Sequence, residues 1–135
     1  MFFLIPTSAL RDEGASYHYV APSRYIDMNE KALGAIEKTL KQKKIPYKEV
    51  MTWSTDGFYR ETPDKISYRI EEGCSVVEME CAALAAVAQF RGAIWGLLLF
   101  TADSLADIDN YDQRDWGSEA FDKALELCLD IIVQM

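Results

Sequence analysis

Residues 75–90 read SVVEMECAALAAVAQF, and the architecture is easiest to infer from this stretch. Residues 75–77 are typical of a short strand, and the alanine-rich run over residues 80–90 is typical of a helix. Gly92 follows as the residue type that commonly ends a helix in the left-handed conformation. A strand that passes directly into a helix is the repeating unit of α/β architecture, so the stretch predicts that class of fold.

The segments on the N-terminal side continue this alternation. Residues 2–5 form an apolar run that Pro6 stops, which predicts a short buried strand. Residues 7–23 are polar and contain Gly14 and Pro22, so we expect a long loop there. Loops of this length in a compact domain commonly carry function.

A helix is expected after Asp27. Asp27 and Glu30 have the spacing of a capping box, and Pro46 ends the segment before a second strand over residues 47–53. The helix is predicted from apolar residues at helical spacing, namely Met28, Ala32, Leu33, Ile36 and Leu40.

Three further elements are expected in the C-terminal part. Thr62 followed by Pro63 is typical of a helix start, and Gly73 of its end. Residues 93–101 are continuously apolar, which is typical of a strand covered on both faces. We expect a last helix to begin at Ser118 and to face the core with one apolar stripe, namely Phe121, Ala124, Leu125, Cys128, Leu129 and Ile132.

Strands that alternate with helices predict one domain over residues 1–135, an α/β fold with a mainly parallel sheet and helices on both faces. Ligands of such sheets bind beyond the carboxyl ends of the strands. The polar segments expected at that edge are residues 7–23, 54–61, 78–80 and 102–114. The sequence therefore predicts a ligand site where these four segments meet.

Composition excludes several classes of function. Lys and Arg number 14 against 22 Asp and Glu, and the net charge of −8 disfavours binding to nucleic acid. Three cysteines without a Cys/His cluster indicate a reduced, cytoplasmic protein without a metal site. The apolar runs are too short to span a membrane, and the seven glycines form no phosphate-binding loop.

Glu78, Met79 and Glu80 lie at the expected junction of strand and helix and have two interpretations. The acids can simply favour the helix dipole in the first turn. Alternatively, one carboxylate accepts two hydrogen bonds from a diol such as that of a ribose, while the methionine packs on the sugar. Spacing by itself leaves both open.

Other candidate residues also have both a structural and a functional interpretation. Asp103 is a turn or cap residue, or an acid that donates a proton to a leaving group. Arg114 pairs with Asp103 or lies on the surface. Phe58 and Tyr59 pack into the core or stack on a base. His18 has no nucleophile motif around it, and its role stays open.

Four segments in this order resemble the nucleoside phosphorylase family: residues 8–19 (SALRDEGASYHY), 54–59 (STDGFY), 77–83 (VEMECAA) and 101–103 (TAD). That family includes purine nucleoside phosphorylases, uridine phosphorylases and adenosylhomocysteine-type nucleosidases. The resemblance covers nearly the whole of this chain. On the side of the family, it covers only the C-terminal half of the fold. It therefore implies a partial phosphorylase/hydrolase-like fold.

The resemblance also implies roles for single residues in substrate binding. Glu80 resembles the acid that holds the ribose hydroxyls, Met79 the methionine against the sugar, and Glu78 the acid beside them. Phe58 resembles the ring that packs on the base, and we expect Tyr59 to contribute next to it.

For the chemistry, Asp103 resembles the acid that protonates a purine at N7, and Arg114 lies about where the family places an arginine that tunes this acid. The implied reaction is that of a pentosyltransferase: phosphorolysis of a purine or related nucleoside, with phosphate as co-substrate and no cofactor. The family's glycine-rich phosphate loop and phosphate-binding arginine belong to the half that has no counterpart here.

The expected protein is therefore active when a missing N-terminal half or a partner completes it. A homo-oligomer or a separate N-terminal half is the expected partner, because a half-sheet leaves strand edges and an apolar face uncovered. The alternatives are a non-catalytic nucleoside-binding remnant and a nucleosidase that uses water.

Overall fold

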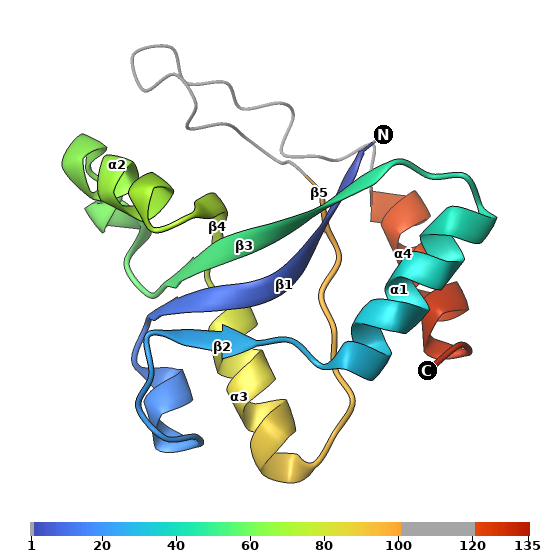
Figure 1. The fold of residues 1–135 in the computed structure, drawn as a ribbon, viewed down its shortest axis with the longest axis horizontal. Coiled ribbons are helices and arrows are strands. Elements are labelled where there is room, and N and C mark those ends of the chain that lie inside the picture. The colour runs from blue at the N-terminus through green and yellow to red at the C-terminus, as the bar shows by residue number, and fades with distance from the viewer. Residues whose placement is uncertain (1, 101–120) are drawn as a thin grey trace.

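The computed structural model describes residues 2–100 and 121–135, which form a sheet with helices packed on it (Figure 1). The elements in chain order are β1 (Phe3–Asp12), the 3-10 helix η1 (Ala15–His18), β2 (Tyr25–Asp27), α1 (Glu30–Gln42), β3 (Tyr47–Thr55), the 3-10 helix η2 (Phe58–Arg60), α2 (Pro63–Glu71), β4 (Cys74–Glu78), α3 (Cys81–Arg91), β5 (Leu99–Phe100) and α4 (Phe121–Ile132).

The long strand pairings of the sheet are parallel. The strands lie in the order β2–β1–β3–β4, and β5 lies beside the start of β1. β1 pairs in parallel with β3, and β3 with β4. The other edge of β1 is shared by β5 and β2, both antiparallel. The expected α/β fold with a mainly parallel sheet is confirmed.

β1 is longer than the sequence indicated. The expected strand stopped at Pro6, but β1 continues through this residue because its second half also pairs with β3. The register shifts between Pro6 and Ser8, which marks a bulge. One extra residue in a strand reverses which side chains face which side. Phe3 and Ile5 therefore pack with α1 and α4, whereas Ala9 packs with α3.

The start of α1 corrects one capping prediction. Asn29 is the N-cap, and its side chain accepts a 3.1 Å hydrogen bond from the N–H of Ala32. Asp27, the expected cap, ends β2 instead, because pairing with β1 outweighs the local signal.

The other helix boundaries follow the sequence closely. Thr62 is the N-cap of α2, and Pro63 is its first residue. Gly73 and Gly92 have φ values of +97° and +65°, which glycine adopts without the steric cost that other residues incur. The predicted helix ends at these two glycines are therefore confirmed.

The apolar run over residues 93–101 forms less of the sheet than expected. Among its described residues Leu99 and Phe100 are paired, and they run antiparallel to β1. The mainly parallel sheet thus contains one antiparallel pair at this end of β1. Among the described residues, β5 pairs with Phe3 and Leu4 of β1, and β2 pairs with residues 8–10 further along the same edge.

α4 buries a different face from the predicted one. Leu127 and Ile131 are buried in the core, and Ala124 packs against it. The expected cap Ser118 lies outside the described residues. The rest of the predicted stripe is exposed to solvent, namely Phe121, Leu125, Cys128, Leu129 and Ile132.

Gly34 and Gly92 form a matched pair for a test of these backbone assignments. A Cβ at either position meets nothing within 4 Å. Gly34 lies inside α1, so Gly34→Ala should raise the free energy of unfolding by about 0.5–1 kcal/mol. Gly92 has a positive φ, so Gly92→Ala should lower it by about 1 kcal/mol. Urea unfolding measures both, and effects of the same sign would contradict the assignment.

Candidate functional site

Three strands bring their carboxyl ends to one edge of the sheet. Asp12 at the end of β1 is paired with Thr55 at the end of β3, and Ser54 is paired with Glu78 at the end of β4. The segments that follow these strands therefore begin side by side. For three of the four predicted segments, the structure supports the expected meeting point.

The fourth segment, residues 102–114, lies outside the described residues. Phe100, at the end of β5, pairs with Phe3 at the start of β1, which is the opposite end of the sheet. Asp103 and Arg114 belong to this segment, and their place in the site stays a prediction.

The carboxylate of Glu78 organises the junction between β4 and α3. Its Oε1 accepts hydrogen bonds from the hydroxyl groups of Ser54 at 2.5 Å and Thr52 at 3.2 Å. Its Oε2 accepts hydrogen bonds from the backbone N–H groups of Glu80 at 2.8 Å and Cys81 at 2.5 Å. Four donors thus occupy both oxygens. Glu78 is the last residue of β4 and lies before the N-cap, so it stabilises the start of α3 from the end of the strand and is not the first-turn acid that the sequence suggested.

Ser54 completes the same junction from β3. Its hydroxyl is fully buried and accepts a 2.9 Å hydrogen bond from the N–H of Ala82 while it donates to Glu78. The sequence reasoning assigned no role to Ser54 or Thr52. The available signal was two polar residues two apart at the end of a strand, which places both on one face.

Glu80 has very different surroundings. It occupies the N-cap position of α3, its side chain is exposed, and its Oε2 accepts a 3.2 Å hydrogen bond from the N–H of Met79. No other described residue bonds to its carboxylate. Glu78 is therefore occupied by the fold, while Glu80 has acceptor positions open to solvent.

Apolar side chains surround this edge without being buried. Phe58 and Tyr59 follow β3 and are 65% and 76% exposed, and their rings meet edge to face at 5.6 Å. Met79, next to Glu80, is also exposed. Rings on a loop that the core does not cover are free to pack on a planar ligand. The interpretation of Phe58 and Tyr59 as core residues does not hold.

Asp12 fixes α2 to the other face of the same edge. Its Oδ2 accepts hydrogen bonds from Trp53 Nε1 at 2.9 Å, Lys65 Nζ at 2.8 Å and Arg69 Nη2 at 3.0 Å. Burial by itself would raise the pKa of Asp12, but the hydrogen bonds from Lys65, Arg69 and Trp53 outweigh burial and hold that pKa below its usual value.

The loop after β1 is held by a buried arginine. Arg11 Nε donates to the hydroxyl of Ser16 at 2.8 Å, and its Nη1 donates to the hydroxyl of Ser23 at 2.7 Å. The N–H of Gly14 donates to Asp56 at 3.0 Å and so links this loop to the loop after β3. The expected long loop is therefore a folded part of the site's edge.

Residues 2–100 and 121–135 contain no group of three His, Cys, Asp or Glu side chains able to hold a metal ion, and no helix among them is long and apolar enough to cross a membrane. Cys74 and Cys81 are free and buried, and burial raises the pKa of the Cys74 thiol to about 11. Buried thiols such as these two behave as small apolar side chains.

His18 is exposed at the end of η1.

A family model connects this geometry to known proteins. The model of the phosphorylase superfamily matches residues 3–133. The chain belongs to the phosphorylase superfamily. The matched residues include the strand-to-helix junction at Glu78–Glu80. The resemblance that the sequence indicated is therefore confirmed at the level of the family. No curated protein matches this superfamily member.

Solved structures share its fold at low sequence identity. AMP nucleosidase from Bacteroides thetaiotaomicron has a TM-score of 0.78 and 24% identity, with 96% of this chain and 50% of that chain covered. A futalosine hydrolase mutant from Helicobacter pylori has a TM-score of 0.77 and 16% identity, with 98% of this chain and 60% of that chain covered. Uridine phosphorylase from Vibrio fischeri has a TM-score of 0.66 and 23% identity, with 98% of this chain and 53% of that chain covered. The superfamily member described here thus spans about half the length of these proteins.

Glu78→Gln tests the junction. The amide would replace one carboxylate oxygen by an NH2 group that faces two of the four donors, so we expect the free energy of unfolding to fall by about 2 kcal/mol. Glu71→Gln is the control, because Glu71 is an exposed acid on α2 and the same charge is removed. Its effect should stay within about 0.5 kcal/mol. Equal effects of the two substitutions in urea unfolding would contradict the role of Glu78.

Asp12→Asn tests the anchor of α2 through its pH dependence. Because the pKa of Asp12 is lowered in the folded state, its contribution is fully present above the usual pKa of 3.8 and is lost as the pH falls below it. We expect Asp12→Asn to lower the free energy of unfolding by about 1–2 kcal/mol at pH 7.

The difference between the wild type and Asp12→Asn should shrink in acid below pH 3.8. Asp64→Asn is the control, because Asp64 is an exposed acid in the first turn of α2. It should change the free energy of unfolding by a few tenths of a kcal/mol, which is about the contribution of one charge near a helix start. A difference for Asp12→Asn that stays constant from neutral pH into acid would contradict the ion-pair anchor.

Proposed function

We propose that the protein binds a nucleoside at the carboxyl ends of β1, β3 and β4 and, within a complete fold, cleaves its N-glycosidic bond by phosphorolysis. The observation that carries this proposal is the division between two adjacent acids. Glu78 accepts hydrogen bonds from four internal donors, one of which is the backbone N–H of Glu80. The backbone of Glu80 is therefore anchored at the start of α3, while its carboxylate stays exposed.

An exposed carboxylate on an anchored backbone, with open acceptor positions, suits a sugar diol. It accepts hydrogen bonds from both hydroxyl groups at once, and it stabilises the positive charge that develops on the sugar as the base departs. Met79 supplies an apolar surface for the sugar, and Phe58 with Tyr59 supplies rings for the base. Glu78 contributes by holding Glu80 in position.

The leaving base needs a proton donor, and the motif of residues 101–103 assigns this role to Asp103. A phosphate oxygen attacks C1′ of the sugar, the C1′–N bond breaks, and its electron pair passes to the base, which takes a proton from Asp103. Arg114 tunes this acid. A purine is the favoured base, because N7 of a purine accepts a proton as the base leaves.

Phosphate is the co-substrate, and the described part of the chain offers it no glycine-rich loop. The chain covers 50% to 60% of the structures that share its fold. We therefore assign the phosphate-binding groups to the remaining part of the fold, and we expect this chain by itself to bind nucleoside without turnover.

Hydrolysis is the second candidate reaction. Two of the similar structures are named as a nucleosidase and a hydrolase, and these proteins use the same fold. In that case water replaces phosphate, and the free sugar is formed in place of the sugar 1-phosphate. A remnant that binds nucleoside without chemistry is the third outcome.

Thermal unfolding with inosine, adenosine and uridine tests the binding step. At a nucleoside concentration about tenfold above Kd, we expect the best ligand to raise Tm by roughly 5 °C. Glu80→Ala should abolish this shift, whereas Glu71→Ala, an exposed acid of α2, should preserve it. A shift that survives Glu80→Ala would contradict the proposed sugar site.

Product analysis with and without phosphate then separates the reactions. The isolated chain should release no base from any of the three nucleosides, and rapid turnover by it would contradict the need for completion. Once the fold is complete, sugar 1-phosphate indicates phosphorolysis, free sugar indicates hydrolysis, and no product indicates a binding remnant.

A further inference from the structure

α2 is held on the sheet by charge more than by apolar packing. Its one buried side chain is that of Arg69, which is 6% exposed. Tyr68 and Ile70 of the same helix are 54% and 63% exposed, and Ile66 is the residue of α2 that packs against a core cluster. Helices in proteins gain most of their stability by burying an apolar face. α2 buries little of one, so its attachment depends on the contacts of Arg69.

The guanidinium of Arg69 joins two carboxylates and an aromatic ring. Its Nη2 donates to Asp12 Oδ2 at 3.0 Å, and its Nη1 donates to Glu72 Oε2 at 2.6 Å. It also lies over the ring of Trp53, 5.5 Å from the centroid. Among the described residues, none bonds to its buried Nε. A buried charge that loses its partners is strongly destabilising, so Arg69 stays buried only while both carboxylates are in place.

Glu72 extends these contacts to the segment before β2. Arg24 Nε and Nη2 donate to its Oε1 at 2.9 Å and 2.8 Å, and Nη2 also donates to its Oε2 at 2.8 Å. Burial by itself would raise the pKa of Glu72, but the hydrogen bonds from Arg24 and Arg69 outweigh burial and hold that pKa below its usual value. We call Asp12, Arg24, Arg69 and Glu72 the α2 latch.

The two exposed rings of the proposed site lie on the same stretch of chain as α2. Phe58 and Tyr59 belong to η2, which ends shortly before α2 begins. Gly57 precedes this stretch, and Gly73, with a φ of +97°, follows it. Hinge motions are absorbed by a few residues at the ends of elements, and glycine allows the widest range of backbone angles. We call residues 58–72 the flap.

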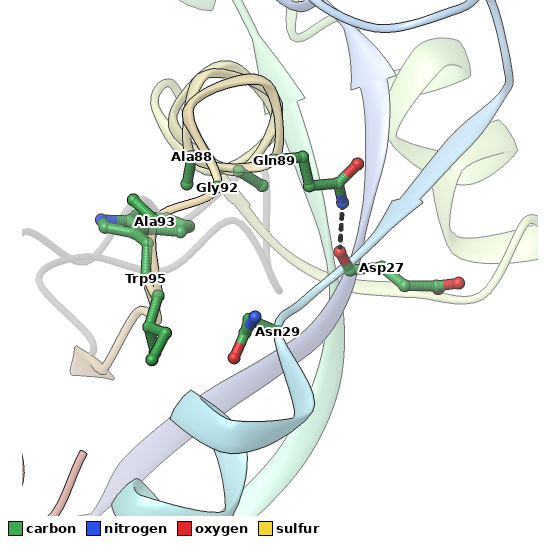
Figure 2. A pocket seen from close by; sticks show the side chains of 9 residues that line it. Asp27, Asn29, Ala88, Gln89, Gly92, Ala93 and Trp95 are labelled. Atoms are coloured by element: carbon green, nitrogen blue, oxygen red, sulfur yellow. Dashed lines mark hydrogen bonds between the residues drawn. The ribbon is translucent and has the colours of Figure 1, made fainter.

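α3 shows how differently a helix of the same chain is attached. It buries four small residues, namely Cys81, Ala82, Ala85 and Ala86. Its last turn is joined to the end of β2 by a neutral hydrogen bond, in which Gln89 Nε2 donates to the backbone oxygen of Asp27 at 3.1 Å beside a cavity of about 300 Å³ (Figure 2). Neither contact involves an ion pair, so α3 should stay in place when the α2 latch breaks.

We propose that the flap opens from the sheet as one unit, that the α2 latch holds it closed through Arg69, and that a bound nucleoside also holds it closed. A segment with few buried apolar contacts opens at a lower cost than the whole fold. The open flap carries Phe58 and Tyr59 away from Glu80, so the closed form binds nucleoside better and is stabilised by it. The effect of nucleoside rests on the proposed function, whereas the opening itself does not.

Native-state hydrogen exchange of the whole chain at neutral pH tests the latch. Arg69→Met removes the charge and keeps an unbranched side chain, so exchange of the flap amides should accelerate at least about tenfold. Amides of α3 and β1 should change by less than about twofold, because the flap opens without the rest of the fold. In about 1 M salt, exchange of the wild-type flap should also accelerate relative to α3, since Arg24 of the latch is 40% exposed.

Arg91→Met is the matched control for the loss of an arginine. The guanidinium of Arg91 also lies over a ring, 5.6 Å from the centroid of Phe90, but no described residue forms an ion pair with it. Flap exchange should therefore be unchanged in this variant.

Two further variants keep the latch testable if Arg69→Met does not fold. Arg24→Met breaks the latch from its exposed side and should accelerate flap exchange by about threefold, because a partly exposed ion pair contributes less than a buried one. Arg69→Lys keeps the charge but loses the planar fork that reaches both Asp12 and Glu72, so its flap exchange should lie between those of the wild type and Arg69→Met.

Inosine, adenosine and uridine test the coupling to the site. At a concentration about tenfold above Kd, the best of these ligands should slow flap exchange by about tenfold. Glu80→Ala should remove this ligand effect and leave exchange of the unliganded flap unchanged, because Glu80 lies outside the α2 latch.

The outcomes separate the flap from the proposed function. Flap exchange that Arg69→Met leaves unchanged, or acceleration that is equal in the flap, α3 and β1, would overturn the latch. If a nucleoside binds in a Glu80-dependent way without slowing flap exchange, the coupling is wrong and the proposed function stands. If the flap opens as expected but none of the three nucleosides binds, the proposed function is contradicted and the latch stands.

Discussion

One carboxylate at a strand-to-helix junction supports the rest of the site. Glu78 accepts two hydrogen bonds from β3 hydroxyl groups and two from the first N–H groups of α3. The start of a helix has N–H groups without internal partners, and a negative charge there is stabilised by the helix dipole. Because this acid joins β3, β4 and α3, the backbone that carries Met79 and Glu80 is held at the edge of the sheet.

The same edge is fixed from the opposite face by Asp12. This acid ties α2 to the ends of β1 and β3 through Trp53, Lys65 and Arg69. A bulge near Pro6 lets β1 send Ala9 toward α3 and the later residues Leu10 and Asp12 toward α2. Helices on both faces are thus anchored by half-buried acids, while the loops between them keep exposed rings and an exposed acid.

Apolar side chains lie exposed on one face of the last helix, away from this edge of the sheet. Phe121, Leu125, Leu129 and Ile132 of α4 are 60% to 63% exposed, while Leu127 and Ile131 on another face of the same helix are buried in the core. The core contacts of α4 therefore use only one of its two apolar faces.

Local sequence by itself determined the α/β class, the helix ends at Gly73 and Gly92, and the acidic junction, because strand and helix periodicity and glycine conformation are local properties. Tertiary contacts decided the rest. Pairing with β3 carried β1 past Pro6, and pairing with β1 drew Asp27 into β2. Packing chose Leu127 and Ile131 as the buried face of a helix that is apolar on two sides. The separate roles of Glu78 and Glu80 likewise arose from Ser54 and Thr52, which are distant in sequence and adjacent in the sheet.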